Sequence, residues 1–326
     1  MSRIRYALLG AFLHTLALLP LWLLYRLSDI AGFLLCHVVR YRRTTVHKNL
    51  TESFPELSHK EINAIGRRFY RNFTDYVVET IKLLHISDKN IAKRIHFEGL
   101  DIIDRHLAEG RSVACYFSHC GNWEWGTSVT LHSRYGNVAD VAYCQVYRPL
   151  KNKWFDDLML RLRSRFGSVS LPKRTTLRHL LEYRRNGVRT VTGFMSDQKP
   201  GSGDTTHILE FLNHPTAMIS GTEQLARRLD MAAVYWDMYK PRRGHYHIVT
   251  RPMCNSAAAT PEGYLTTLYA DMLQQTIRHN PAIWLWSHKR WKNPVQMPPT
   301  ASKDPAINNP ACQERNQAKH PSQPKQ

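Results

Sequence analysis

The apolar positions gather first at the N-terminus. Residues 6–25 read YALLGAFLHTLALLPLWLLY, and only His14 and Pro20 interrupt the run. Twenty residues make a helix of about 30 Å, the thickness of a bilayer's hydrocarbon core. A second apolar run, 30–39, is too short to span by itself and leads to a basic flank of Arg40, Arg42 and Arg43. The pattern predicts that residues 1–43 are a hydrophobic membrane anchor.

A signal peptide and a buried helix of a soluble protein are the two other interpretations of this segment. Arg3 and Arg5 resemble the start of a signal peptide, but no small-residue cleavage site follows the apolar run. A buried helix of a soluble protein has the same composition. For a membrane anchor, a single span and an in-plane hairpin both remain open, because basic residues flank both sides.

Helical periodicity continues after the anchor, over 44–98. Ser58 followed by Glu61 has the spacing of a capping box, which predicts a helix start at this point. Apolar residues then recur every three or four positions, as on one face of a helix, at Ile62, Ile65, Phe69, Phe73, Tyr76 and Val77.

From residue 99 to residue 292 the pattern alternates between helices and short apolar runs. We expect helices over 100–109, 122–132, 150–166, 175–185, 221–229 and 261–279. We expect strands over 113–117, 138–146, 190–195 and 208–212, and a hairpin formed by 232–239 and 246–250. Such alternation predicts an α/β fold with a mainly parallel central sheet flanked by helices. Residues 293–326 hold seven prolines and few apolar positions, so a disordered polar tail is expected.

Charge adds a prediction about partners. Lys and Arg number 45 against 26 acidic residues, a formal charge of +19, which favours nucleic acid, anionic lipid head groups or an acidic carrier protein. Nucleic acid has only the charge in its support, because no zinc finger, RNP-like motif or basic heptad region is present. We therefore expect no nucleic-acid partner.

Cysteine and histidine usage restricts the compartment and the cofactors. None of the six cysteines forms a C-x-x-C pair, which favours a reducing compartment and a body facing the cytoplasm. The 17 histidines are scattered, so we expect neither a metal site nor another cofactor.

The strongest candidate for chemistry is the segment Ser118-His-Cys-Gly-Asn-Trp-Glu124, between the expected strand 113–117 and the next helix. In open α/β sheets, ligands bind beyond the carboxyl ends of the strands. His119 and Glu124 would point apart on one helix, but a turn at Gly121 lets them approach each other. A neutral His can take a proton from a hydroxyl, and a carboxylate can orient it. The alternative is a structural His with Glu124 on the surface.

These residues resemble a known family. HCGNWE is similar to the H-x4-D/E motif of the lysophospholipid acyltransferase superfamily, and more narrowly to the Kdo-dependent lipid A lauroyl and myristoyl acyltransferases. Further blocks follow in that family's order up to residue 292: Asn49-Leu50 with Phe54-Pro-Glu-Leu57, Arg148-Pro149 through Arg165-Phe-Gly167, Asp197-Gln198 with Phe211-Leu212, Thr222 to Ala226, and Trp284 to Lys292. The sequence departs from the family at 199–207, which is polar, and at Asn213-His214, where a Gly is usual.

The resemblance implies an O-acyltransferase of the bacterial inner membrane. It would move a fatty acyl chain from an acyl thioester, with acyl carrier protein as the expected donor, to a hydroxyl of a lipid A-type glycolipid. His119 would be the general base and Glu124 would orient it. A lysophospholipid, a phosphatidylinositol mannoside or an aminolipid remains an alternative acceptor. A non-catalytic, membrane-attached glycolipid-binding protein is the alternative outside this class.

The other site residues follow from the same blocks. Arg148 is expected to stabilise the oxyanion or to bind phosphate, and the backbone near Gly121 is a second oxyanion donor. Substrate binding is expected at Asn122, Arg165, Asp197 and Gln198.

Two further patterns concern surfaces. Residues 148–192 hold 12 basic and 3 acidic residues, a charge that can steer an acidic carrier protein. Trp284, Trp286 and Trp291 alternate with basic residues, which suits either a membrane interface or a core.

Overall fold

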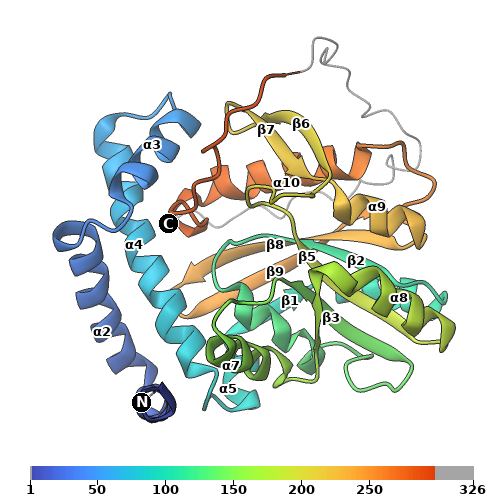
Figure 1. The fold of residues 1–326 in the computed structure, drawn as a ribbon, viewed down its shortest axis with the longest axis horizontal. Helices are drawn as coiled ribbons and strands as arrows, with labels where there is room; N and C mark the ends of the chain where they lie inside the picture. Colours follow the sequence, from blue (N-terminus) through green and yellow to red (C-terminus); the bar gives the residue numbers. More distant parts are fainter. Residues whose placement is uncertain (1, 298–326) are drawn as a thin grey trace, which may run out of the picture.

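A seven-stranded sheet forms the centre of the protein, in the order β1-β9-β8-β2-β5-β3-β4 (Figure 1). The structure is a computed structural model and describes residues 2–297. The strands are β1 Ile95–Glu98, β2 Val113–Phe117, β3 Val141–Tyr147, β4 Val169–Pro172, β5 Arg189–Met195, β6 Thr206–Phe211, β7 His214–Ile219, β8 Ala232–Arg242 and β9 His245–Cys254. Every neighbouring pair in the large sheet is parallel except the β8–β9 hairpin. The predicted α/β class with a mainly parallel sheet is confirmed.

Strand β2 lies in the middle of the sheet and is covered on both faces. Ala114 and Tyr116 belong to one apolar core, whereas Val113, Cys115 and Phe117 belong to the other. This explains why its sequence is continuously apolar rather than alternating, and why the strand could be predicted with its observed bounds.

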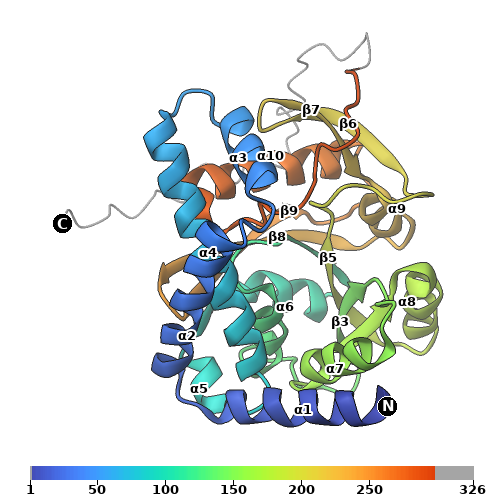
Figure 2. The same ribbon diagram turned by 60° about the vertical axis from the view of Figure 1, so that its left-hand side comes forward.

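Helices cover both faces of the sheet. They are α1 Ser2–Leu18, α2 Leu21–Phe33, the π-helical turn η1 Leu34–Val38, α3 Arg43–Ser53, α4 His59–Lys82, α5 Asp88–Ala92, α6 Leu100–Ala108, η2 Trp123–Leu131, α7 Lys153–Ser164, η3 Lys173–Thr175, α8 Thr176–Arg185, α9 Gly221–Arg228, α10 Tyr264–His279 and η4 Pro281–Ile283. Figures 1 and 2 show α9, α10 and the separate β6–β7 hairpin on one side of the sheet, with α6 and α7 on the other.

The N-terminal region differs from the predicted continuous helix over 6–25. The chain breaks at Pro20, whose φ of −64° and extended ψ make it the N-cap of α2. Proline has no amide hydrogen and clashes with the preceding turn, so α1 ends before it. By length and composition, one helical stretch among the described residues, Leu21–Val38, is long and apolar enough to cross a membrane.

The start of α4 agrees with the sequence. The Ser58 and Glu61 side chains and backbones bond reciprocally, which confirms the predicted capping box. The helical segment expected over 44–98 ends earlier, because residues 95–98 form strand β1 beside β9. Ile95 and Phe97 point inward and alternate with exposed residues, a strand pattern too short to stand out. The predicted tail lies mostly outside the described residues, which end at 297.

A buried ionic cluster fastens α2 and α4 to the β8–β9 hairpin. Asp75 of α4 accepts hydrogen bonds from Ser28 (2.7 Å), Lys240 (3.0 Å) and Arg243 (2.6 Å). Arg243 also binds Asp29 of α2 at 2.8 Å. Asp75 is 1% exposed, so its charge is stable there only because several cationic and hydroxyl donors surround it.

Candidate active site

His119 lies directly beyond the carboxyl end of β2, and Asp197 lies beyond the end of β5. The two strands are parallel neighbours, so their ends meet at one edge of the sheet. His119 Nδ1 is 2.7 Å from Asp197 Oδ1, and the His119 backbone N–H donates to Asp197 Oδ2 at 2.9 Å. The carboxylate therefore holds both the ring and the backbone of His119.

Asp197 is buried, with 1% of its surface exposed. Burial alone would raise its pKa, but the charge of His119 and hydrogen bonds from His119 and Trp284 outweigh burial and hold the pKa at about 2. The Trp284 indole donates to Oδ2 at 2.9 Å. Asp197 is thus an ionised carboxylate at neutral pH, which can only accept hydrogen bonds.

This carboxylate determines which nitrogen of His119 carries the proton. Because Asp197 only accepts, Nδ1 must donate, and the neutral imidazole keeps its lone pair at Nε2. The Gln198 amide nitrogen lies 3.0 Å from Nε2 and can donate to it. His119 is therefore arranged as a base, with Gln198 occupying the position of an incoming proton donor.

Glu124, which the sequence predicted to bond to His119, has a different partner in the structure. It lies in the first turn of η2, and Arg163 of α7 holds it with two hydrogen bonds of 2.6 and 2.7 Å. In this structure the carboxylate in contact with His119 is Asp197 rather than Glu124, because the strand order brings β5 beside β2. The role predicted for Glu124 has no contact with His119 in its support. No sequence spacing marked Arg163 as the partner of Glu124.

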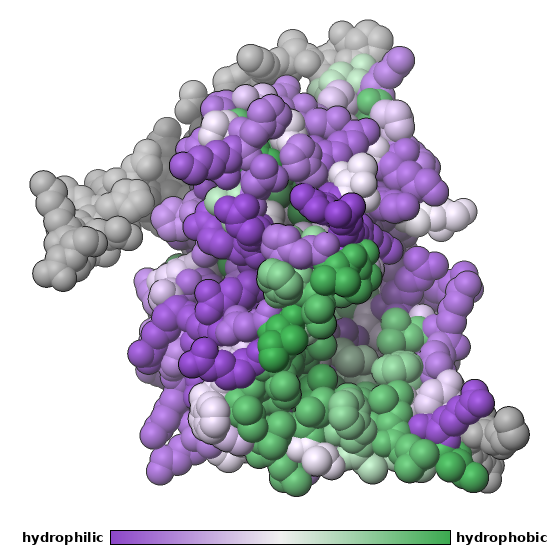
Figure 3. All heavy atoms as spheres, turned by 90° about the vertical axis from the view of Figure 1, so that its left-hand side faces the viewer, coloured by the Kyte–Doolittle hydropathy of each residue, from purple (hydrophilic) through white to green (hydrophobic). Residues whose placement is uncertain are grey.

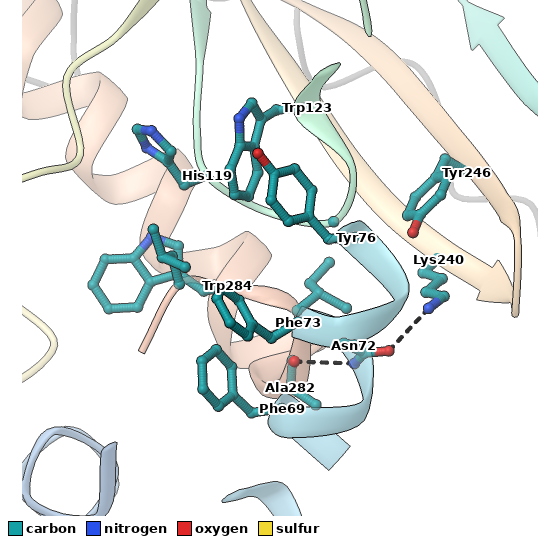
Figure 4. A pocket seen from close by; sticks show the side chains of 13 residues that line it. Phe69, Asn72, Phe73, Tyr76, His119, Trp123, Lys240, Tyr246, Ala282 and Trp284 are labelled. Carbon is teal, nitrogen blue, oxygen red and sulfur yellow. Dashed lines mark hydrogen bonds between the residues drawn. The ribbon is translucent and has the colours of Figure 1, made fainter. Parts of the chain in front are cut away.

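A narrow pocket lies beside His119 and encloses a cavity of only about 10 Å³ (Figure 4). Its wall is largely aromatic and apolar, and polar groups lie at one end. The lining residues are Phe69, Asn72, Phe73 and Tyr76 of α4, His119, Gly121, Trp123, Lys240, Tyr246, and 282–285. The Trp123 ring lies edge-on to His119 at 4.9 Å and stacks on Tyr76 at 4.1 Å. Such a wall suits an alkyl chain placed next to the base.

A second buried carboxylate, Glu79 of α4, connects this site to the anchor. Its oxygens accept hydrogen bonds from Tyr25 of α2 (2.9 Å), Asn122 (3.0 Å) and Tyr246 of β9 (2.7 Å). Complete burial raises the pKa of Glu79. No role for Glu79 was predicted from the sequence. Its signal is that it is the single acid in the mainly apolar segment 76–83, where a buried charge needs a hydrogen-bond partner.

Asn122 and Arg165 do not meet the expectation of substrate binding. Asn122 is 0% exposed; it caps η2 through the Trp125 N–H and donates to Glu79. Asn122 therefore serves as the N-cap of η2, and its complete burial leaves it no surface that a substrate could contact. The Arg165 guanidinium binds the carbonyl oxygens of Leu83 and Ile86, so it fastens α7 to the end of α4.

Arg148 and the backbone at Gly121 are also placed differently from expectation. The Gly121 N–H donates to Ile283 O at 3.0 Å and is therefore not free for an oxyanion. Arg148 follows β3, is exposed, and has its guanidinium near the 201–204 loop. It lies outside the set of residues that line the pocket at His119.

The C-terminal tryptophans belong to the core rather than to a surface. Trp284 and Trp286 are 3% and 0% exposed, and both the Trp284 indole and its backbone hold the site. The nearby His288 is half-buried, and this desolvation lowers its pKa to about 4. The interpretation of these residues as a membrane interface is wrong for Trp284 and Trp286.

Metal and thiol chemistry find little support in this site. Within residues 2–297, no group of three or more His, Cys, Asp or Glu side chains is placed to hold a metal ion. Burial raises the pKa of the Cys120 thiol, so a thiolate nucleophile beside His119 is disfavoured.

Comparison with known proteins identifies the family to which the chain is similar. Residues 2–293 match the family described as bacterial lipid A biosynthesis acyltransferase. A lipid A biosynthesis acyltransferase of Haemophilus influenzae is 23% identical over 247 residues, covering 75% of this chain and 74% of the relative. A lipid A biosynthesis lauroyltransferase of Escherichia coli is 25% identical over 282 residues, covering 84% and 87%.

Gly121 gives a first prediction about the turn. Its φ is +61°, and a Cβ there would lie 2.7 Å from Met238 Sδ and 3.0 Å from the Tyr246 ring. We expect Gly121→Ala to cost more than about 2 kcal/mol and to reduce turnover strongly, because it displaces His119. Gly110→Ala is the control: its φ is +79° with nothing within 4 Å, so it should cost only about 1 kcal/mol and leave turnover unchanged. Equal stability of the two variants in urea unfolding would contradict this account.

Glu79 gives a second prediction. Glu79→Ala leaves the buried donors of Tyr25, Asn122 and Tyr246 without an acceptor, so we expect a loss of about 3 kcal/mol or more. Glu182→Ala, an exposed position on α8, should change stability by less than about 0.5 kcal/mol. Thermal unfolding of both variants measures the difference, and a Glu79→Ala protein as stable as Glu182→Ala would remove the proposed importance of the carboxylate.

Proposed function

Because the chain belongs to the bacterial lipid A biosynthesis acyltransferase family, we propose that it transfers a fatty acyl chain from acyl carrier protein to a hydroxyl of a lipid A-type acceptor, with His119 as the base. Family membership supports the class, an O-acyltransferase acting on a glycolipid. The observation that carries the mechanism is the Asp197–His119 pair at an apolar pocket.

The proposed reaction uses the lone pair at His119 Nε2. The acceptor hydroxyl takes the place of the Gln198 amide and gives its proton to Nε2 while its oxygen attacks the thioester carbonyl carbon. Asp197 stabilises the imidazolium that forms. The tetrahedral intermediate then expels the thiolate, the carbon–sulfur bond breaks, and the imidazolium returns the proton to the sulfur. The products are an ester and a free thiol.

Gln198 is the donor that we propose for the oxyanion. Its amide lies beside the reacting position, and it is released from Nε2 when the hydroxyl binds. Arg148 keeps the other role considered for it, binding an anionic group of the substrate. It is exposed and follows β3, whose carboxyl end lies at the same edge of the sheet as those of β2 and β5.

Glu124 has a supporting role in this proposal. The Glu124 side chain is 3% exposed and forms an ion pair with Arg163. This pair joins α7 to η2, the helix that follows the turn at His119. Removing one partner leaves a buried charge unpaired, which is strongly destabilising. Glu124 therefore acts through the position of η2 rather than through proton transfer.

Acyl carrier protein is favoured as donor by the basic residues that remain exposed. Several basic side chains in 148–192 pair internally, as Lys153 does with Asp157 and Lys173 with Asp204. Four arginines on or next to α8 are exposed: Arg174, Arg178, Arg184 and Arg185. Such a surface attracts an acidic carrier. We place the enzyme at the inner membrane with this surface in the cytoplasm, where acyl carriers are loaded.

The function is tested with purified protein, labelled acyl donors and a panel of acceptors. We expect transfer from acyl carrier protein to a lipid A precursor, with a rate that falls as salt rises because the association is electrostatic. Acyl coenzyme A should be the poorer donor. If a lysophospholipid, a phosphatidylinositol mannoside or an aminolipid is acylated faster than the lipid A precursor, the proposed acceptor is wrong. If the protein binds glycolipid but transfers no acyl chain to any acceptor, the enzymatic proposal is wrong.

The mechanism is tested by three single variants. His119→Ala should abolish transfer, and Asp197→Asn should lower kcat by at least about 100-fold, since the tautomer is no longer fixed. Both proteins should fold. Glu124→Gln should lose stability as well as activity, because Arg163 becomes unpaired. Circular dichroism and turnover distinguish these outcomes; full activity of Asp197→Asn, or a stable but inactive Glu124→Gln, would reverse the assigned roles.

A further inference from the structure

Helix α1 has two different faces. Ile4, Leu8 and Phe12 point outward and are 68%, 67% and 58% exposed. On the opposite face, Tyr6 stacks on Trp154 of α7 with ring centroids 5.4 Å apart, and Ala17 is fully buried. At 100° per residue these two sets lie on opposite sides of the helix, so α1 is apolar on the side that contacts no part of the described protein.

Both ends of α1 are attached to the body. Near its start, the Tyr6 hydroxyl accepts a hydrogen bond from Asn152 at 2.8 Å. At its end, the Lys82 ammonium of α4 donates to the carbonyls of Ala17 and Leu19, both at 2.7 Å. Helix α1 is 17 residues long, or about 25 Å, and therefore lies along the body over its whole length.

Helix α2 and the turn η1 are attached in the same way. Leu24, Ser28, Gly32 and Cys36, each four residues from the last, are buried. Ser28 bonds Thr74 and Asp75 of α4, and Arg243 bonds the Tyr25 carbonyl. The outward face is mainly apolar but also carries the exposed side chains of Arg26 and His37. Its exposed apolar residues are Trp22, Leu27, Ile30, Phe33, Leu34 and Val38.

These attachments argue against a span by either helix in this fold. A lone spanning helix is surrounded by hydrocarbon, whereas α1 and α2 each keep one face on a charged protein body. Arg26 and Asp29 lie in the middle of α2, and Asp29 is committed to Arg243. Moving α2 into a bilayer centre would break this pair or bury it in lipid, at a large cost.

We propose that the protein spans no membrane through residues 2–43 and that the outward faces of α1, α2 and η1 lie in the plane of a bilayer surface rich in anionic lipid. Figure 3 shows the apolar surface as one continuous area over α1 and α2, next to a hollow and bordered by polar residues. Residues 1–43 contain six arginines and one acid, and that acid is paired, so the charge complements anionic head groups. The inference concerns only the anchor and does not depend on the proposed chemistry.

Topology is tested with the full-length protein in bacterial membranes. An N-terminal epitope tag and a cysteine introduced by Pro20→Cys, at the exposed junction of α1 and α2, are probed from each side with protease and a membrane-impermeant maleimide. Mass spectrometry identifies the labelled peptide. We expect both sites to react in inverted vesicles and neither in intact spheroplasts. Three results would overturn the proposal. An N-terminal tag that protease reaches in intact spheroplasts indicates a single span, and maleimide labelling of the residue-20 cysteine in intact spheroplasts indicates a spanning hairpin. A residue-20 cysteine that is protected from both sides indicates insertion into hydrocarbon.

The docking face is tested by flotation with vesicles of phosphatidylglycerol and phosphatidylethanolamine. Leu8→Glu combined with Phe12→Glu should weaken binding about tenfold or more, because two apolar side chains no longer leave water. Leu181→Glu, which changes an exposed leucine on α8 (43% exposed), should bind as the unchanged protein does. Unaltered binding by the double variant, or equal loss in Leu181→Glu, would contradict this face. Acyl transfer in detergent micelles measures the chemistry separately and should persist in all three proteins.

Discussion

The buried carboxylate of Glu79 is the constraint on which the arrangement of this protein depends. A carboxylate removed from water must receive hydrogen bonds, and the three side-chain donors it receives come from three parts of the chain: Tyr25 of the anchor, Asn122 of the catalytic turn and Tyr246 of the sheet. None of these parts can shift without leaving a polar group unpaired. One acid therefore fixes the anchor, the turn after His119 and the edge of the sheet relative to one another.

The polar contacts and the apolar wall of the pocket lie on two different faces of helix α4. Asn72, Asp75 and Glu79 lie three and four residues apart, so they share a face that meets Lys240 and Tyr246 of the β8–β9 hairpin. Phe69, Phe73 and Tyr76 lie on the adjoining face and form the apolar wall of the pocket. The helix that holds α1 and α2 thus also lines the pocket, so the apolar N-terminal surface and the candidate active site are connected through α4.

Local features were predictable from the sequence, whereas the pairing of distant residues was not. The capping box of Ser58 and the buried strand β2 depend on neighbours in the chain, and both were predicted. The position of His119 at a strand end followed from β2 alone. The carboxylate that contacts it could not be predicted, because Glu124 is near in sequence but Asp197, 78 residues away, is near in space. That proximity follows from the strand order β2-β5-β3, in which β5 is inserted between strands that are consecutive in sequence. The hydrophobic periodicity of the sequence contains no information about the order of strands in a sheet.

The anchor illustrates the same limit in another way. Composition makes 6–25 a plausible span, but the outcome depends on what the inward face of each helix contacts, and those contacts come from α4, α7 and the β8–β9 hairpin. A hydrophobic count averages the outward and inward faces and cannot separate them. With the inward face occupied by protein, the surface position that we propose leaves the outward face in contact with lipid. In that proposal, an acyl acceptor held in the lipid approaches the pocket from the side on which α2 and α4 lie, where the wall of the pocket is apolar.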